Sequence, residues 1–484
     1  MPERPNIVFL VLDTARARSL SPYNISGAET PFLSKLAEDN LFYEQAISPA
    51  PWTLPAHVSM FTGLTPTEHQ VNSWEDRLSK ESTTLAGLLS DSGYQTTGFS
   101  HNMWLSNTFG LTTGFQDFNE QWQLIQSETN LFNTAHHLQG LSFTEKVKQI
   151  SSDIFSNNPL ANVINAIYAK FIHNRSDHGA NQTNKNIKKW LNKEWDQSKP
   201  FFLFANYLEP HIEYDPPKEY VDKYCDGVSV KDAKEIPQEP VKHILGDIQL
   251  SQDDFESLRA LYKGELDYLD QKIREVFGIL SDVGALENSV VIVVGDHGEN
   301  LGENGLMSHM YSLHENLIRV PCIIKTPERK DQDIEEPIQT HDLFALCLHY
   351  SRVDFSLDSV DSQLPPPFAM PRDYTVSELL AENPPENAVH RETGGEYDEE
   401  KFESLRKSRQ VIRKGGLKLE RVIDGQNNLY EIDGFDETLS PEKNRSSLKE
   451  NLDEYTTSKS TKMKNEESEL DGNIEQQLKE LGYL

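Results

Sequence analysis

Two acidic positions of the sequence stand at the ends of apolar runs that are rich in β-branched residues. Asp13 follows residues 6–12, and Asp296 and His297 follow residues 289–294 in the same manner. Ligands of α/β sheets bind at the carboxyl ends of buried strands, so we expect these side chains to converge at one edge of a sheet. Carboxylate and imidazole ligands suit a divalent ion, and calcium, magnesium, manganese and zinc all remain open. The alternative is that each aspartate merely ends a strand or caps a helix.

A second group of residues centres on Thr53, the first residue of the segment Thr-Leu-Pro-Ala-His that ends at His57. Pro55 suits the first turn of a helix that runs to about Thr62 and is closed by Gly63, which places Thr53 just ahead of the helix. A hydroxyl there faces unpaired backbone N–H groups and the positive end of the helix dipole, a setting that favours sulfate or phosphate. Alternatively, Thr53 is only a capping residue that contributes about 1 kcal/mol.

Four of the fifteen histidines stand at strand ends, in a first helical turn or in loops rich in glycine and proline; they are His57, His101, His211 and His309. Any one of them alone fits a surface histidine or a satisfied core histidine. Together they can donate hydrogen bonds to a tetrahedral anion and protonate a leaving alkoxide.

The elements that must position these residues alternate along the chain. Apolar runs typical of buried strands occur at residues 7–12, 95–100, 201–207, 289–294 and 320–325, and helical patterns occur between them, at residues 83–92 and 258–281. This alternation predicts a layered α/β fold with a mostly parallel central sheet.

The composition divides the chain into three parts. Residues 1–352 are expected to form the catalytic domain, with a helical insertion or lid over residues 119–198, where the pattern loosens. Residues 353–371 are rich in Pro, Ser and Asp, which marks a linker or long loop. Residues 372–484 are expected to form a small C-terminal subdomain with an antiparallel sheet of three short strands and a terminal helix. Within it, residues 437–472 are charged and are predicted to be solvated.

The charge balance excludes several classes of partner. The 46 basic and 77 acidic residues give a formal net charge of −31. Such a field repels polyphosphate backbones and anionic lipid, so neither nucleic acid nor a membrane surface is expected as a partner. The acidity fits either a surface adapted to high salt, which we favour, or acidic residues gathered in loops and tail.

The cysteines and the lengths of the apolar runs indicate in which cellular compartment the protein is expected. Cys225, Cys322 and Cys347 are widely spaced and form no Cys-x-x-Cys pair, so neither a disulfide framework nor a thiolate zinc site is expected. The apolar run at residues 7–12 is shorter than a signal-peptide core, and no run is long enough for a membrane span. A cytoplasmic location is therefore predicted, with export by an unrecognised route as the alternative.

An ordered set of motifs closely resembles the sulfatase family of the alkaline phosphatase superfamily over most of the chain. The motifs lie at residues 6–13, 53–57, 62–66, 209–211, 295–300 and 318–321. The most specific is Asp-His-Gly-Glu, which starts at Asp296 and is followed by Leu-Gly-Glu-x-Gly. The resemblance implies an alkaline-phosphatase-like three-layer sandwich, with the small antiparallel sheet and last helix of those enzymes in the tail.

The sequence departs from the family pattern at three positions. Sulfatases carry Cys-x-Pro-x-Arg, whose cysteine is oxidised to formylglycine; here Thr53 stands at the cysteine and His57 at the arginine. Threonine cannot become formylglycine, whereas related members of the superfamily use threonine to attack phosphorus. Thr14 stands where sulfatases place a second acidic metal ligand, and Glu299 and Glu303 are predicted to be solvated rather than metal-bound.

The resemblance also implies a role for each site residue. One divalent ion, with calcium favoured and magnesium, manganese or zinc possible, would be held by the metal ligands Asp13, Thr53, Asp296 and His297. His211 and His309 would neutralise charge and protonate the departing oxygen, while His57 takes part of the missing arginine's role as an imidazolium. His101 and Arg16 would contact substrate, although Arg16 fits pairing with the acidic surface equally well.

The leading hypothesis is a metal-dependent hydrolase of sulfate or phosphate esters that is independent of formylglycine, with Thr53 as the nucleophile. Its substrate would be a small anionic ester of a sugar, a lipid head group or an aryl alcohol. Two alternatives remain: a non-catalytic protein of the same fold that binds an anionic sugar or lipid head group, and a phosphotransferase of the same superfamily. The sequence leaves sulfate and phosphate undecided.

Overall fold

The computed structural model describes most of the chain in eight segments. They are residues 4–121, 177–225, 233–328, 332–356, 360–380, 397–423, 425–440 and 445–466, with Val389 and Thr393 in addition. Most of the insertion predicted at residues 119–198, and the terminal helix predicted at the end of the chain, lie outside the described residues.

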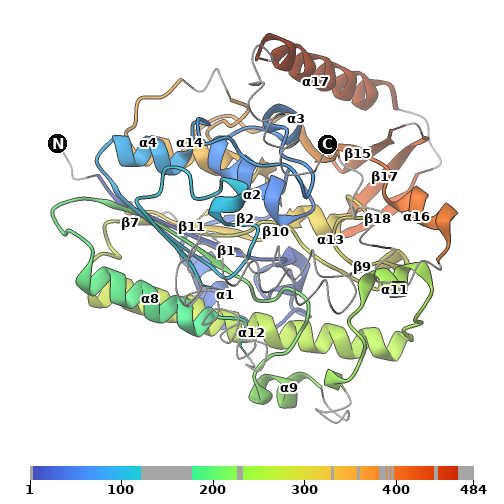
Figure 1. Ribbon diagram of the computed structural model, residues 1–484, viewed down its shortest axis with the longest axis horizontal. Coiled ribbons are helices and arrows are strands. Elements are labelled where there is room, and N and C mark those ends of the chain that lie inside the picture. Colours follow the sequence, from blue (N-terminus) through green and yellow to red (C-terminus); the bar gives the residue numbers. More distant parts are fainter. Residues whose placement is uncertain are drawn as a thin grey trace, which may run out of the picture.

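An eight-stranded sheet with the strand order β12-β2-β11-β7-β1-β6-β4-β5 forms the centre of the molecule (Figure 1). Its strands β7, β1, β6, β4 and β5 run parallel to one another, and β12 runs parallel to β2, whereas β11 is antiparallel to both of its neighbours. The mostly parallel α/β fold predicted from the sequence is thus confirmed. The strands are β1 (Asn6–Leu12), β2 (Leu41–Tyr43), β4 (Gln95–Ser100), β5 (Asp117–Glu120), β6 (Phe201–Tyr207), β7 (Ser289–Gly295), β11 (Cys322–Lys325) and β12 (Gln332–Ile334).

Helices cover both faces of this sheet, which explains why its central strands β1, β6 and β7 consist mostly of apolar residues. Alternate residues of β1 belong to two separate cores: Phe9 packs in one and Leu10 in the other. The first core includes α2 (Thr53–Thr62), α4 (Leu85–Asp91) and α14 (Asp342–Ser351), and the second includes α1 (Pro31–Asp39), α8 (Ala180–Lys193) and α12 (Gln252–Asp282). Figure 1 shows the resulting three-layer sandwich.

Short elements connect these layers. They are β3 (Ala46–Ile47), β10 (Arg319–Val320) and β13 (Ile338–Gln339), which form a three-stranded sheet, β8 (Asn300–Leu301), β9 (Met307–Ser308), α3 (Pro66–His69), α9 (Lys218–Tyr224), α11 (Pro240–Leu245), α13 (Glu315–Ile318), α16 (Glu399–Leu405), and the 3₁₀ turns η1 (Ala17–Ser19), η2 (Asn107–Phe109) and η3 (Glu303–Gly305).

The single strand predicted at residues 320–325 is two strands in the structure. Val320 ends β10, which pairs with β3, while Cys322 starts β11 of the central sheet. Pro321 separates them because proline has no N–H to donate to a strand ladder.

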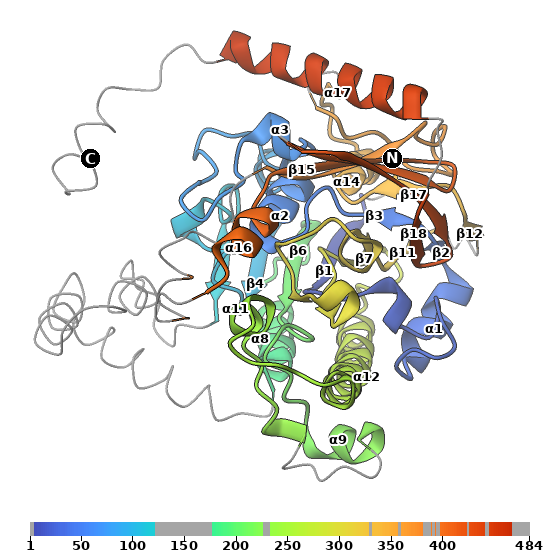
Figure 2. The same cartoon turned by 90° about the vertical axis from the view of Figure 1, so that its right-hand side faces the viewer.

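A five-stranded antiparallel sheet forms the C-terminal part, with α17 (Arg445–Glu466) lying against it (Figure 2). Its strands are β14 (Thr375–Leu379), β15 (Arg409–Lys414), β16 (Leu417–Val422), β17 (Asn427–Asp433) and β18 (Asp436–Leu439). The small antiparallel sheet is confirmed, although the sequence analysis missed β14 and β18. The prediction that residues 437–472 are solvated is wrong for the start of α17, because Leu448, Leu452 and Tyr455 pack on the sheet.

A buried carboxylate joins this C-terminal sheet to the catalytic part. Glu378 of β14 accepts hydrogen bonds from the backbone N–H of Thr67 at 2.9 Å and from its hydroxyl at 2.6 Å. It also accepts from Gln410 of β15 at 2.8 Å and from Tyr455 of α17 at 3.2 Å. One side chain therefore ties four elements together.

Removing this carboxylate leaves several buried donors without a partner. We therefore expect Glu378→Ala to lower the free energy of unfolding by about 3 kcal/mol in urea denaturation. Glu256→Ala, on the exposed face of α12, is the matched control and changes stability little. Equal unfolding midpoints for the two variants would contradict the assigned role of Glu378.

Candidate active site

The candidate site lies at the carboxyl edge of the parallel strands β7, β1, β6 and β4. Leu12 of β1 is level with Gly295 of β7, so the next residues along the two strands, Asp13 and Asp296, leave the sheet side by side. His101 follows β4 in the same direction. Strand order and register thus bring together residues that are far apart in the sequence.

Asp13 is fully buried, and its two carboxylate oxygens have different surroundings. Its Oδ2 accepts hydrogen bonds from the side-chain amides of Asn102 at 2.7 Å and Asn206 at 3.3 Å. Its Oδ1 is buried without a hydrogen-bond partner. Strand periodicity alone identifies neither asparagine. For Asn206 the sequence does hold a signal, a polar residue inside the otherwise apolar strand β6.

Asp296 repeats this arrangement from the neighbouring strand. Its Oδ1 accepts the backbone N–H groups of Thr14 at 3.1 Å and of His297 at 2.8 Å, and its Oδ2 is buried without a hydrogen-bond partner. Thr14 therefore serves the site through its backbone. Its φ of 55° is a strained value for a β-branched residue, and it turns the chain immediately after Asp13.

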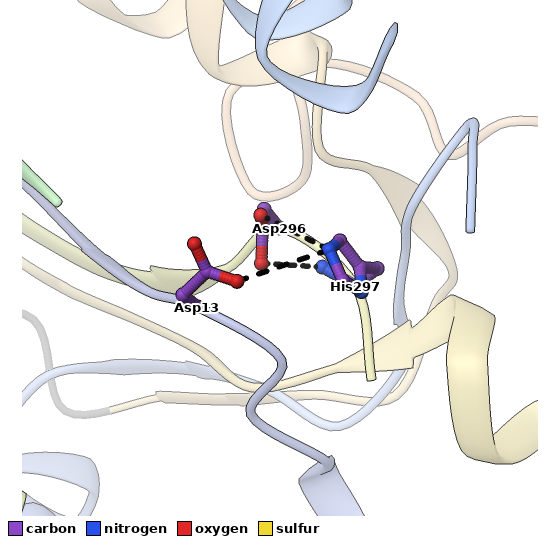
Figure 3. Close-up of side chains that lie close together, drawn as sticks. All are labelled: Asp13, Asp296 and His297. Carbon is purple, nitrogen blue, oxygen red and sulfur yellow. Dashed lines mark hydrogen bonds and ion pairs between the residues drawn. The ribbon is translucent and has the colours of Figure 1, made fainter. Parts of the chain in front are cut away.

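His297 completes the group, and its tautomer follows from its contacts. Its Nδ1 lies 2.9 Å from the carbonyl oxygen of Gly298, which can only accept, so the lone pair is on Nε2. That Nε2 lies 3.4 Å from Oδ2 of Asp296 and 3.9 Å from Oδ1 of Asp13 (Figure 3). The residue after His297 must be a glycine, because a Cβ on Gly298 would clash with the carbonyl oxygen of Asn316 at 1.9 Å.

These donor atoms fit a divalent cation. The ligand atoms of Asp13, Asp296 and His297 lie within 4.8 Å of one another, and all three residues are buried. Burial raises the pKa of both carboxyl groups, and for Asp296 the neighbouring Asp13 adds to the rise. Two buried carboxylates whose free oxygens face an imidazole lone pair are costly unless a positive charge lies between them. Oxygen and nitrogen ligands of this kind suit a divalent metal.

Thr53 approaches the same three residues from α2, which belongs to one of the two helical layers that cover the sheet. Its Oγ1 lies 3.3 Å from Nε2 of His297 and 3.4 Å from Nδ2 of Asn102, and the residue is 1% exposed. Thr53 is the first residue of α2, with Trp52 in the capping position, so the expectation that Thr53 precedes the helix is corrected by one residue. The structure therefore brings the hydroxyl to the residues expected to hold metal.

His57 does not carry the charge expected of it. Its Nδ1 donates to the carbonyl oxygen of Thr53 at 2.9 Å, and its ring packs edge-on against Phe61 and Phe204. Burial lowers the pKa of His57 to about 4, so the imidazole is neutral near pH 7. Burial therefore disfavours the imidazolium expected of His57 in the free site. The ring buttresses the start of α2, and its Nδ1 also lies 3.6 Å from Oδ2 of Asp296.

His309 and His211 lie next to the group. The ring centre of His309 is 4.5 Å from that of His297 and 5.3 Å from that of His211. His309 is held in a tight turn, between Ser308 with φ of 67° and Met310 with φ of 86°. Three histidines at such spacing form one wall of the site.

Glu299 is fully buried behind His309, with its Oε1 3.3 Å from Nδ1 of that ring. The prediction that Glu299 is solvated is wrong because the Asp-His-Gly-Glu loop turns inward at Gly298. Burial raises the pKa of Glu299 to about 8, although the nearby His211 lowers it in part.

Arg16 has the second of the two environments expected for it, an acidic partner, whereas His101 lies at a cavity wall. Arg16 donates to Glu303 at 2.7 Å and to Asn316 at 3.2 Å, so its charge is engaged in an ion pair with a half-buried acid. The prediction that Glu303 is solvated is corrected accordingly. His101 is buried over Gly179, where a Cβ would lie 2.2 Å from its Nε2. It lines a cavity together with His211.

A family model described as sulfatase matches residues 5–351 of the chain. The chain belongs to the sulfatase family. It is accordingly an ester hydrolase of the alkaline phosphatase superfamily. An arylsulfatase of Clostridium perfringens is 23% identical over 400 residues, which cover 74% of this chain and 77% of the relative. An uncharacterised sulfatase of Escherichia coli is 23% identical over 360 residues, covering 73% and 69%.

Solved structures of the sulfatase fold superpose along nearly the whole chain. A protein bound to its substrate D-glucosamine-2-N,6-O-disulfate has a TM-score of 0.66 at 14% identity, with 95% of this chain and 99% of that chain covered. A phosphonate monoester hydrolase of Agrobacterium radiobacter has a TM-score of 0.63 at 16% identity, with 95% and 96% covered. Among the described helices of the present sulfatase, none is long and apolar enough to cross a membrane.

The geometry predicts that divalent-cation binding depends on Asp296. A cation present at 100 times its dissociation constant should stabilise the wild type by about 2.7 kcal/mol, which raises the melting temperature. We expect Asp296→Asn to lose this rise, because one charged ligand is gone. Asp333→Asn, an exposed position, is the control and should keep it. Thermal melts with calcium, magnesium, manganese and zinc measure the effect, and an unchanged rise in Asp296→Asn would disprove the site.

Proposed function

We propose that this sulfatase-family protein hydrolyses sulfate or phosphate esters by nucleophilic attack of Thr53, without formylglycine. The observation that supports this most is the 3.3 Å separation of the Thr53 hydroxyl from Nε2 of His297, inside the cluster that contains the free oxygens of Asp13 and Asp296. A nucleophile and a metal-type ligand set in contact are the parts that such a reaction requires.

The chain's own residues prepare the attack. Thr53 is held at the first turn of α2 by the helix backbone, and Asn102 orients the hydroxyl from the other side while it fixes Asp13. A divalent cation, with calcium favoured by family resemblance, would lower the pKa of the hydroxyl and offset charge on the ester oxygens. Asp13, Asp296, His297 and Thr53 are the proposed ligands.

His309 is the proposed donor to the departing oxygen. Its Nδ1 faces Glu299, which leaves Nε2 for the substrate. Burial lowers the pKa of His309, so the free site favours the neutral ring. An anionic ester bound against the ring favours the protonated form. Thr53 attacks after its hydroxyl proton has passed to solvent, which forms the threonyl ester while the bond to the alcohol breaks and the alcohol leaves with the proton of His309. Water then attacks the same sulfur or phosphorus atom and gives a proton to the now neutral His309, and the Thr53 oxygen departs and regains a proton from solvent.

The comparisons support an ester of sulfur or phosphorus acids without deciding between them. The relatives include proteins named arylsulfatase and choline-sulfatase, and the structural neighbours include phosphonate monoester hydrolases. The threonine favours a phosphorus ester as the substrate, because threonine cannot form the aldehyde hydrate that typical sulfatases use as the nucleophile.

Replacing the hydroxyl of Thr53 tests the nucleophile. Thr53→Val keeps the side-chain shape and should lower kcat/KM by at least about 10³-fold on any ester that the wild type cleaves. Thr53→Ser should retain activity, and intact-protein mass spectrometry of a slow reaction should show a covalent adduct on the hydroxyl-bearing forms. Thr113→Val, a half-buried threonine outside the site, is the control.

Activity that survives in Thr53→Val would contradict the proposed nucleophile. A wild type that binds sulfate or phosphate and metal tightly but cleaves no aryl sulfate, phosphate or phosphonate would instead identify a binding protein with this fold.

His309 should matter most when the leaving group is poor. We expect His309→Ala to lower kcat about 10²- to 10⁴-fold on alkyl esters, which need a proton, and far less on 4-nitrophenyl esters. The slope of log kcat against leaving-group pKa measures this difference. Equal losses on both ester types would assign His309 to anion binding rather than proton transfer.

A further inference from the structure

A cavity of about 420 Å³ opens beside the candidate nucleophile. This volume lies in the range of small-molecule sites, about 300–1,000 Å³. The residues that line it come from the segments that follow β4 and β6, together with His178 ahead of α8; they are His101, Asn102, Met103, Trp104, Phe109, His178, Leu208, His211, Ile212 and Glu213.

The cavity begins at the reacting groups. Asn102, on its wall, donates to Asp13 at 2.7 Å and lies 3.4 Å from the Thr53 hydroxyl. His211, also on its wall, lies against His309. An ester whose central atom is next to Thr53 therefore has room for its leaving group in this cavity.

One wall of the cavity is a supported aromatic surface. The ring centre of Trp104 lies 5.4 Å from that of Trp52, 5.8 Å from that of Trp74 and 4.7 Å from that of Phe109. Packing on several sides holds Trp104 in one orientation, and Met103, Leu208 and Ile212 extend the apolar lining. Such a wall suits a flat apolar group rather than a heavily hydroxylated one.

The charges around the cavity disfavour a second anion. No lysine or arginine is among the described residues that line it, and Glu213 contributes an exposed carboxylate. The charge of His178 is engaged by the buried Glu265, whose Oε1 lies 3.3 Å from the ring nitrogen.

We propose that the cavity selects esters with a single sulfate or phosphate group and a flat apolar leaving group, and that Glu213 rejects leaving groups with a second negative charge. This inference rests on the proposed function, because it assumes that Thr53 is the nucleophile and that the sulfur or phosphorus atom of the ester lies next to its hydroxyl. It points away from polysulfated sugars and towards aryl or similar esters.

Matched leaving groups test the charge rule. The 3-carboxyphenyl and 3-carbamoylphenyl esters have nearly the same shape and differ in one negative charge. We expect wild-type kcat/KM to be about tenfold higher for the carbamoyl ester, which corresponds to about 1.4 kcal/mol of repulsion between two negative charges near the protein surface. Glu213→Gln should reduce this ratio and Glu213→Lys should invert it. Glu219→Gln, an exposed acid outside the cavity, should leave it unchanged.

A second variant tests the aromatic wall. Trp104→Leu should raise KM for the phenyl ester about tenfold while leaving the methyl ester, which is too small to reach the wall, nearly unaffected. Circular dichroism checks that this variant folds. If it does not, the Glu213 series still decides the proposal, because Glu213 is exposed.

The possible failures are distinguishable. Equal rates on the carboxyl and carbamoyl esters, with Thr53→Val inactive, would overturn the selectivity rule and leave the nucleophile standing. Undiminished activity in Thr53→Val would overturn the proposed function whatever the ester preference.

Discussion

The constraint on which the site depends is the burial of two facing carboxylates. Asp13 and Asp296 are both withdrawn from water, and each has one oxygen satisfied by hydrogen bonds and one without a partner. Both carboxylates can stay ionised in a protein interior only if positive charge offsets them. The hydrogen-bond donors leave room for such a charge. They bind Oδ2 of Asp13 and Oδ1 of Asp296, so the other oxygen of each carboxylate is left for a cation.

The fold supplies what this constraint requires. Adjacent parallel strands deliver the two aspartates at one level, and α2 brings Thr53 from the layer above. The backbone carbonyl of Gly298 fixes the tautomer of His297, so that its lone pair faces inward. Reactive groups, metal-type ligands and the mouth of the leaving-group cavity thus meet at one edge of a sheet, and the C-terminal sheet holds α3 in place through Glu378.

The sequence predicted the parts that follow from strand periodicity. The runs at residues 95–100 and 201–207 coincide with β4 and β6, and the strand-end rule places Asp13, Asp296 and His297 together. It did not predict contacts that depend on three-dimensional approach: the amides on Asp13, the inward turn of Glu299, or the neutral state of His57. Salt adaptation and the cytoplasmic location stay predictions, since both depend on surroundings outside the molecule.

The most direct measurement is a crystal structure with manganese and vanadate, with the metal located by anomalous scattering. We expect one metal ion bound to Asp13, Asp296, His297 and Thr53 at about 2.0–2.2 Å, with vanadium bonded to the hydroxyl oxygen of Thr53. Metal bound elsewhere, or vanadate in the site with the threonine hydroxyl turned away, would contradict this expectation.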